Sequence, residues 1–254
     1  MKKKFSLIIF IFVLISIACG FGNGDKEEAQ EASVPTLAPT TPILNAPTTQ
    51  PLAETEIIVE EQAPEPVSNA PFYTEEFNTE QLNTWFPQIT NGDIDQVDIF
   101  TKNGKLVFKI GGTDTYMYLI NEAYSYGDVR LDIEVENRGS NTNNVGLICR
   151  FNEDGWYEYV INSNGMYELW SYTPDYGYEM IHQGGSKHIR VGQDINQYAV
   201  ICNGDRLTLI INGVETHTQN VRTLRDEGLV GVAVSSTFAI PVEVEFEYFT
   251  VSQP

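Results

Sequence analysis

Three carboxylates alternate along a short stretch of the sequence and could together do acid–base chemistry. Asp132, Glu134 and Glu136 are separated by single apolar residues, so on a strand they would share one face. Two carboxyl groups on either side of a glycosidic bond can act as acid and nucleophile in its cleavage. Arg130 and Arg138 would lie on the same face. Because charges that alternate with apolar residues are also typical of an ordinary surface strand, we favour a solvated face over a catalytic one.

Residues that could bind a metal ion are sparse. Asp93, Asp95 and Asp98 lie close together and could supply oxygen ligands to calcium, but a polar turn explains the same pattern and is the favoured interpretation. No histidines or cysteines have the HExxH or CxxC spacing of a zinc site. Three scattered histidines are expected at the surface: His182, His188 and His217. We therefore predict no cofactor, with calcium as the alternative.

The first nineteen residues have the pattern of an export signal. Lysines at 2–4 precede an apolar run over 7–15, and Ala18 stands just before Cys19. This pattern resembles the signal peptide of a bacterial lipoprotein, which implies removal of residues 1–18 and attachment of lipid to Cys19. The sequence departs from that motif at Ser16, where an aliphatic residue is usual. A plain secretory peptide and an uncleaved anchor are the alternatives. All three place the rest of the protein outside the cytoplasm, and we predict a lipid anchor in the cell membrane.

Once Cys19 carries lipid, Cys149 and Cys202 are the only cysteines left, and they can pair in one way. Both lie on predicted core strands, and an oxidising compartment would allow a disulfide between them. Two buried free thiols are the alternative. Catalysis by either cysteine is disfavoured, because each follows an apolar run and no histidine is near in the sequence.

Residues 19–71 differ in composition from the rest of the chain. They hold eight of the chain's twelve prolines and six threonines, with too little apolar surface to offset the entropy of ordering the chain. We predict a disordered linker that acts as a stalk. The remaining residues, 72–254, suffice for one domain with a sizeable core. A formal net charge of −20 disfavours nucleic acid as a partner.

The dominant periodicity beyond residue 71 is two, which predicts strands rather than helices. Alternating or β-branched runs predict strands over 106–110, 129–136, 207–211 and 242–251. The last of these would close a sheet beside the start of the domain. Asn-Gly pairs that favour tight hairpin turns stand at 103–104, 164–165 and 212–213. Together these features predict an all-β antiparallel sandwich of two sheets over one core.

The order and spacing of these turns and core positions resemble a known family. They look like the concanavalin A-like jelly roll, in the laminin-G-like branch near the 3-keto-disaccharide hydrolase domain. The resemblance covers roughly residues 72–252 and specifies fold far better than activity. The residues that carry it are Phe77, Trp85, Gly104 to Leu106, Tyr126 to Leu131, Gly146 to Phe151, Tyr157, Tyr159, Ile161, Gly165, Tyr167, Leu169, Asn196, Tyr198, Val200, Cys202, Gly204, Leu207, Leu209, Asn212, Gly213, Gly228 to Gly231 and Phe246 to Phe249.

The aromatic stretch from Trp156 to Tyr178 is the best candidate for ligand binding. The resemblance places Tyr157, Tyr159, Ile161, Tyr167 and Leu169 in the core. Other rings are then left for the opposite face or the loop around Pro174, where they could stack on sugar rings while a guanidinium and an amide bind hydroxyls. Cross-strand aromatic pairing without a ligand is the alternative. The predicted ligand-binding residues are Arg150, Trp156, Asn162, Trp170, Tyr172, Tyr176 and Tyr178.

Three functions fit this sequence. The favoured one is a non-catalytic, surface-anchored module that binds glycan or another cell-envelope polysaccharide, or mediates adhesion. The first alternative is a sugar hydrolase like the neighbouring family, and the second is a structural domain that binds proteins. Binding is favoured over catalysis because the sequence offers no matched acid and base pair beyond the alternating strand at 132–136. That strand resembles the acidic strand of laminarinase-type glycosidases, but its order, Asp-Ile-Glu-Val-Glu, departs from their Glu-x-Asp-x-x-Glu and Glu-x-Asp-x-Glu patterns.

Overall fold

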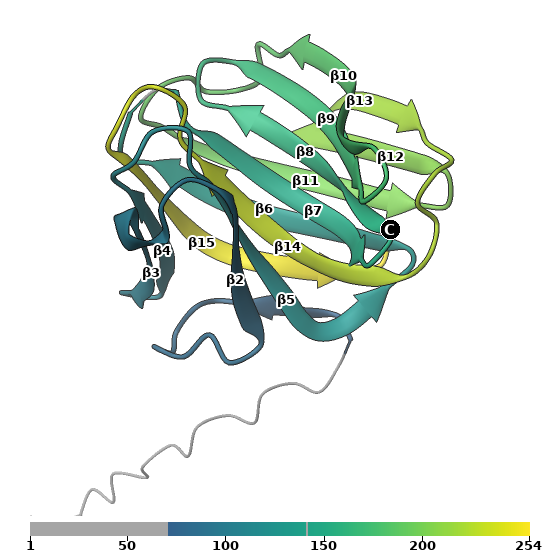
Figure 1. Cartoon of the computed structure of the whole chain (residues 1–254), viewed down its shortest axis with the longest axis horizontal. Helices are drawn as coiled ribbons and strands as arrows, with labels where there is room; N and C mark the ends of the chain where they lie inside the picture. Colours follow the sequence, from purple (N-terminus) through teal and green to yellow (C-terminus); the bar gives the residue numbers. More distant parts are fainter. Residues whose placement is uncertain (1–70, 141) are drawn as a thin grey trace, which may run out of the picture. The chain divides into compact units, whose positions relative to one another are not determined.

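The segments predicted as strands are strands in the structure, a computed structural model that describes residues 71–140 and 142–254. The predicted signal, Cys19 and almost all of the predicted linker lie outside these residues. Two antiparallel sheets stack face to face (Figure 1), which confirms the predicted all-β sandwich. A single turn of 3-10 helix, η1, spans Ile94–Gln96. No helix within the described ranges is long and apolar enough to cross a membrane.

The first sheet has eight strands in the order β13-β12-β11-β6-β15-β4-β3, with β1 paired to β15. Because β1 pairs Tyr73 with Val251, the last strand does close a sheet beside the start of the domain, as predicted. The strands are β1 (Tyr73–Glu75), β3 (Val97–Lys102), β4 (Lys105–Ile110), β6 (Val129–Asn137), β11 (Ile195–Asn203), β12 (Arg206–Ile211), β13 (Val214–Asn220) and β15 (Val242–Ser252).

The second sheet has seven strands in the order β10-β9-β8-β7-β14-β5-β2. Its strands are β2 (Trp85–Asn91), β5 (Tyr116–Tyr126), β7 (Asn144–Asn152), β8 (Gly155–Asn162), β9 (Met166–Thr173), β10 (Gly177–Gly185) and β14 (Gly228–Ser235). We call the face of this sheet that points away from the other sheet the outer face. All pairings within both sheets are antiparallel.

The main core lies between the two sheets. The five residues that the sequence placed inside are all buried there: Tyr157, Tyr159, Ile161, Tyr167 and Leu169. A smaller apolar cluster lies on the outer face and includes Tyr118, Ile120, Ile148, Trp156 and Ala233. Alternation along the strands of the seven-stranded sheet therefore places apolar residues on both of its faces. One face packs in the main core, and the outer face is where a site can form.

Two of the predicted Asn-Gly turns have the expected backbone. Asn103 and Gly104 both have positive φ, and so do Asn212 and Gly213, as a two-residue hairpin of type I′ requires. The third turn differs. Its loop has three residues between the end of β8 and the start of β9, and in this Asn-Gly pair only Gly165 has positive φ.

A disulfide between Cys149 on β7 and Cys202 on β11 joins the two sheets through the core. The pairing predicted from the cysteine count is therefore the one present in the structure.

Candidate functional site

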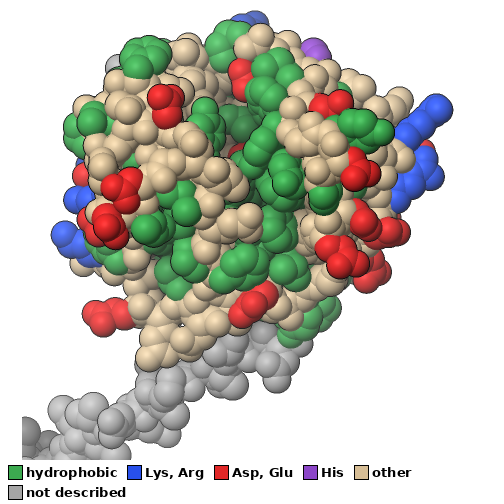
Figure 2. Space-filling model, viewed as in Figure 1, with side chains coloured by type: hydrophobic (Ala, Val, Ile, Leu, Met, Phe, Trp, Pro, Cys, Tyr) green, Lys and Arg blue, Asp and Glu red, His purple; other side chains and the backbone are tan. Residues whose placement is uncertain are grey.

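A pocket of about 360 Å³ opens on the outer face of the seven-stranded sheet. Every strand of that sheet contributes residues to it, including both edge strands, β2 and β10, so the sheet curves around the pocket. Figure 2 shows this face hollowed near its centre, with hydrophobic side chains along much of the hollow. The lining residues are Thr90, Asn91, Tyr116, Met117, Tyr118, Asn144, Gly146, Glu158, Val160, Glu168, Trp170, Tyr178, Ala233 and Ser235. A volume of this size is within the usual range for small-ligand sites.

Glu158 lies deep in this pocket, with only 6% of its surface exposed. The Tyr118 hydroxyl donates a hydrogen bond to Oε2 of Glu158 over 3.0 Å, and the Tyr178 hydroxyl lies 3.3 Å from that of Tyr118. Burial raises the pKa of Glu158 to about 7, a net value in which the hydrogen bond from Tyr118 opposes the rise and the nearby charge of Glu168 adds to it. Burial also raises the pKa of Tyr118. Glu158 can therefore exchange a proton near neutral pH.

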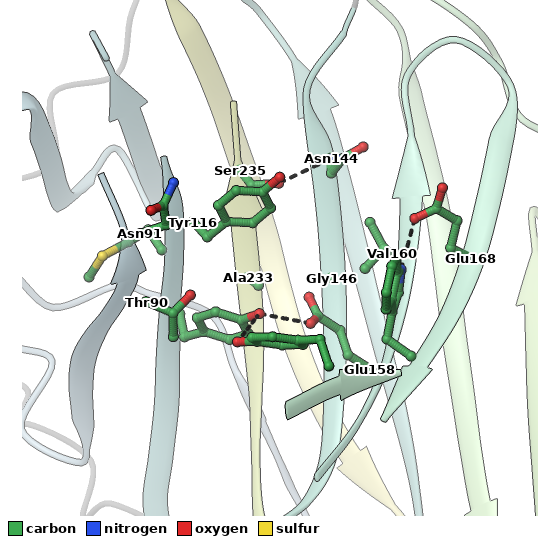
Figure 3. A pocket seen from close by; sticks show the side chains of 14 residues that line it. Thr90, Asn91, Tyr116, Asn144, Gly146, Glu158, Val160, Glu168, Ala233 and Ser235 are labelled. Carbon is green, nitrogen blue, oxygen red and sulfur yellow. Dashed lines mark hydrogen bonds between the residues drawn. The ribbon is translucent and has the colours of Figure 1, made fainter. Parts of the chain in front are cut away.

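Glu168 is the second carboxyl group of the pocket. Glu158 pairs across β8 and β9 with Trp170, and Glu168 pairs with Val160, so the two carboxylates are diagonal neighbours on one face, for which Cα atoms are typically about 7–8 Å apart. The Trp170 Nε1 donates to Oε2 of Glu168 over 2.8 Å, and Gln183 donates to Oε1 over 2.9 Å. In Figure 3 both carboxylates lie across the pocket from Thr90 and Asn91.

Small residues make room for the carboxyl group of Glu158. A Cβ atom built on Gly146 of β7 would overlap Oε1 of Glu158 and come within 2.9 Å of the Cβ of Ala233. Glycine at this position is therefore required for Glu158 to keep its place.

Polar groups on other strands complete the lining. The Asn144 side-chain amide donates to the Ser235 hydroxyl over 3.1 Å, and the Asn91 amide donates to the backbone carbonyl of Asp114. Amides fixed in this way keep further donors and acceptors for a ligand that carries several hydroxyl groups.

Two of the predicted ligand-binding residues, Trp170 and Tyr178, line the pocket. Two more stand behind them on the same face. Trp156 stacks on Tyr172 with ring centroids 4.2 Å apart, and Tyr172 packs against Tyr178 at 4.9 Å. Trp156 is covered by Tyr172 and by Phe151. Trp156 and Tyr172 therefore support the wall of the pocket from behind and do not form its surface.

Asn162 and Tyr176 lie outside the pocket lining. The Asn162 amide donates to Oδ1 of Asn144 over 2.6 Å, so Asn162 positions a lining residue. Tyr176 is 77% exposed in the turn between β9 and β10. The structure thus brings part of the predicted set together and separates the rest.

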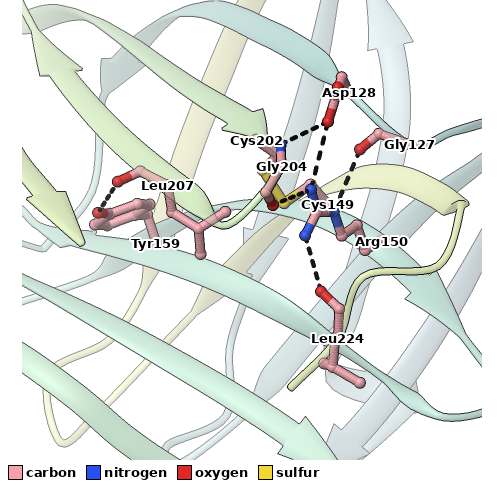
Figure 4. The surroundings of a disulfide bond; sticks show 9 residues. All are labelled: Gly127, Asp128, Cys149, Arg150, Tyr159, Cys202, Gly204, Leu207 and Leu224. Carbon is pink, nitrogen blue, oxygen red and sulfur yellow. Dashed lines mark hydrogen bonds and ion pairs between the residues drawn. A yellow bond between two sulfur atoms is a disulfide. The ribbon is translucent and has the colours of Figure 1, made fainter. Parts of the chain in front are cut away.

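The prediction that Arg150 binds ligand is wrong. Its side chain is 1% exposed, and its guanidinium donates to the backbone carbonyls of Gly127, Gly204 and Leu224 at 3.3, 2.7 and 2.8 Å. Asp128 lies 3.6 Å away. Figure 4 shows these partners converging on Arg150 beside the disulfide. Because every nitrogen of the guanidinium is engaged by the protein, none is free to bind a sugar hydroxyl.

The strand of alternating carboxylates is β6, in the other sheet. Glu136 pairs with Arg138 at 3.0 Å and with Lys105 at 3.8 Å, and Arg130 binds Asp132 through two hydrogen bonds. These are partly exposed ion pairs, as the favoured interpretation of a solvated face required.

Of the three candidate calcium ligands, Asp93 is engaged by the protein itself. Asp93 accepts a hydrogen bond from the backbone of Asp95 and caps η1. His182 on β10 stacks on His217 on β13 with centroids 3.8 Å apart, and the Tyr159 hydroxyl lies 2.9 Å from Nδ1 of His217. These two histidines are therefore half-buried where the edges of the two sheets meet. In the ranges 71–140 and 142–254, no group of three histidine, cysteine or acidic residues could hold a metal ion.

Sequence reasoning missed Glu158, Glu168 and Tyr118. The first two carried a signal, because Glu158 is two residues from Trp156 and Glu168 is two residues from Trp170, so each shares the face already assigned to its neighbour. Tyr118 carried none, since its approach to Glu158 depends on the order of strands within the sheet.

Comparison with known proteins supports a carbohydrate-related jelly roll. A family model described as a 3-keto-alpha-glucoside-1,2-lyase-like domain matches residues 73–249. No curated protein matches the sequence. A glycoside hydrolase family 16 endo-glucanase from Bacteroides ovatus is similar in structure, with 8% identity and a TM-score of 0.55 over 71% of this chain and 99% of that one.

Two further solved structures are similar. A protein with a galectin-like fold from Bacillus subtilis has a TM-score of 0.58 and 8% identity over 71% of this chain and 94% of its own. A Bacillus licheniformis beta-glucanase has a TM-score of 0.53 and 12% identity over 72% and 98%. At such identities the likeness shows the concanavalin A-like fold but not the activity, which has to be argued from the residues of the site.

Proposed function

Because the chain belongs to the family of 3-keto-alpha-glucoside-1,2-lyase-like domains, we propose that it binds a saccharide in the pocket on the outer face. The observation that carries this proposal is the composition of that one pocket. It combines aromatic rings, among them Trp170 and Tyr178, with hydrogen-bonding groups such as Asn144 and Ser235. Rings offer apolar faces to the C–H side of a sugar, and the polar groups bind its hydroxyls.

The site is arranged before any ligand enters. The hydrogen bond to Glu168 fixes the indole of Trp170, and contact with Trp156 and Tyr172 fixes the ring of Tyr178. Side chains that are already ordered lose little conformational freedom on binding, which favours affinity.

A glycan array followed by calorimetry on the purified protein tests this proposal. Trp170→Ala should weaken binding of the best ligand at least tenfold, or about 1.4 kcal/mol. Tyr176→Ala is the matched control, since Tyr176 is an exposed ring outside the pocket, and it should leave the affinity unchanged. Equal affinities of the Trp170→Ala variant and the wild type would place the binding surface elsewhere.

A second function is favoured by the two carboxyl groups of the pocket. Glu158 and Glu168 lie on one face, and burial raises the pKa of Glu158 to about 7. A buried carboxyl group that can exchange a proton near neutral pH, with a second carboxyl group close by, suits acid–base cleavage of a glycosidic bond. In this function Glu158 transfers the proton to or from the sugar, and Tyr118 holds its carboxyl group in place.

Incubation with 3-keto-α-glucosides and with unoxidised oligosaccharides separates binding from cleavage. Release of a free sugar by the wild type and its loss in Glu158→Gln would establish the second function. Binding without any product would leave the first function alone.

We also propose that the protein works outside the cytoplasm, attached to the membrane through lipid on Cys19. The export signal and the cysteine beside it support this location. The disulfide between Cys149 and Cys202 is the kind of bond that persists in oxidising compartments.

A further inference from the structure

The charges inside the pocket are of one sign. Its titratable lining residues include Glu158 and Glu168, and no lysine, arginine or histidine belongs to the lining. In Figure 2 the lysine and arginine side chains visible on this face lie toward its edges, away from the hollow. A ligand group placed between the carboxylates is therefore in a negative potential, which low-dielectric walls strengthen.

Glu158 is only partly satisfied by the protein. Tyr118 donates to its Oε2, but within the described ranges 71–140 and 142–254 no side chain or backbone group donates to its Oε1, which faces Gly146. Ionisation of a carboxyl group that is 6% exposed costs free energy unless a partner is supplied. A sugar hydroxyl would provide one hydrogen bond, whereas an ammonium group would provide hydrogen bonds and also neutralise the charge.

The walls suit a cation as well. Tyr116, Tyr118, Trp170 and Tyr178 all line the pocket, and the negative potential over aromatic ring faces attracts ammonium groups. A negatively charged sugar, in contrast, would face two carboxylates with no counter-charge in the lining.

We propose that the saccharide bound in this pocket carries a free, positively charged amino group, as a deacetylated amino sugar does, and that Glu158 and Glu168 bind this group. The inference rests on the proposed saccharide-binding function and names the class of its ligand. An N-acetylated sugar of the same length lacks the charge and serves as the matched ligand.

Calorimetry on the purified protein at pH 7 and low ionic strength tests the inference with three oligosaccharides of equal length. These are a glucosamine oligomer, its N-acetylated counterpart and a neutral glucose oligomer. We expect the glucosamine oligomer to bind at least tenfold more tightly than the other two, and this preference to shrink as salt is added. Glu158→Gln should reduce the ratio below threefold, and Glu168→Gln should reduce it by a smaller factor.

Glu179→Gln is the control variant. It removes the same charge from the strand that carries Tyr178, but Glu179 is exposed and outside the pocket lining, so the ratio should not change. If none of the oligosaccharides binds, the saccharide-binding function fails. If all three bind equally, that function stands and the amino-group inference is overturned. A preference that survives Glu158→Gln, or that Glu179→Gln abolishes, also overturns it, because the general acidity of the domain would then be its cause.

Discussion

The buried guanidinium of Arg150 connects three segments that are far apart in the sequence, those of Gly127, Gly204 and Leu224. Arg150→Met keeps much of the side-chain volume but leaves three carbonyls without their donor. We expect a loss of about 3–5 kcal/mol in the free energy of unfolding, as for other broken buried networks. Urea unfolding measures it, and sugar affinity at 10 °C should match the wild type. Weaker binding with unchanged stability would instead restore Arg150 as a ligand-binding residue.

Glu158 should make the stability of the domain depend on pH. Its pKa is about 7 when folded and 4.5 when exposed, so between these pH values the folded state holds a proton that the unfolded state has lost. The contribution of Glu158 to stability is therefore complete below pH 4.5 and falls as the pH rises through 7. Replacing it with glutamine removes this dependence.

The measurement is urea unfolding of the wild type and of Glu158→Gln at pH 4.5 and pH 8.5. Relative to the wild type, the variant should gain on the order of 3 kcal/mol between the two pH values. Parallel pH profiles of the two proteins would mean that Glu158 titrates normally in the folded state.

At the scale of strands, the disulfide ties β7 of one sheet to β11 of the other. We expect the double variant Cys149→Ala, Cys202→Ala to unfold with a free energy lower by about 2–5 kcal/mol. Addition of dithiothreitol should lower the unfolding midpoint of the wild type toward that of the variant and leave the variant unchanged. A wild type that is insensitive to full reduction would show that the sheets do not depend on this bond.

Period-two patterns explain why so much of the fold was predictable. Alternation located the strands, and the family resemblance sorted Tyr157 and Leu169 correctly into the core. It also assigned Trp156 to the correct face, but the pattern contains no information on which ring covers it. The face that a residue takes depends on its own strand, whereas the ring that covers it depends on how neighbouring strands pair.

The pocket shows the same limit. Tyr118 meets Glu158 because β5 and β8 belong to one curved sheet, although neither pairs with the other. Arg150 illustrates the opposite error. Its closeness in sequence to the rings suggests a place beside them. Arg150 instead has a positive φ and lies within a register shift between β7 and β8. Its side chain turns into the protein, toward the backbone carbonyls that it binds.

For the molecule as a whole, the testable question is where it is held in the cell. We expect Cys19→Ala to move the protein from the membrane fraction to the soluble fraction, because the lipid is attached to this sulfur in the predicted lipoprotein. Labelling with a fatty acid analogue should mark the wild type and not the variant. Membrane association of Cys19→Ala equal to that of the wild type would favour an uncleaved anchor instead.

The point where the N-terminal chain joins the sandwich also has a mechanical consequence. β1 has three residues, Tyr73–Glu75, and pairs only with β15 among the described strands. Just before it, Phe72 contacts the ring of Tyr126, and the Tyr126 hydroxyl donates to the carbonyl of Pro71. Tension on the preceding chain is therefore borne first by these contacts and by the three-residue pairing of β1 with β15. We expect this segment to peel away at low force and lengthen the preceding chain, while the seven-stranded sheet that carries the pocket stays folded.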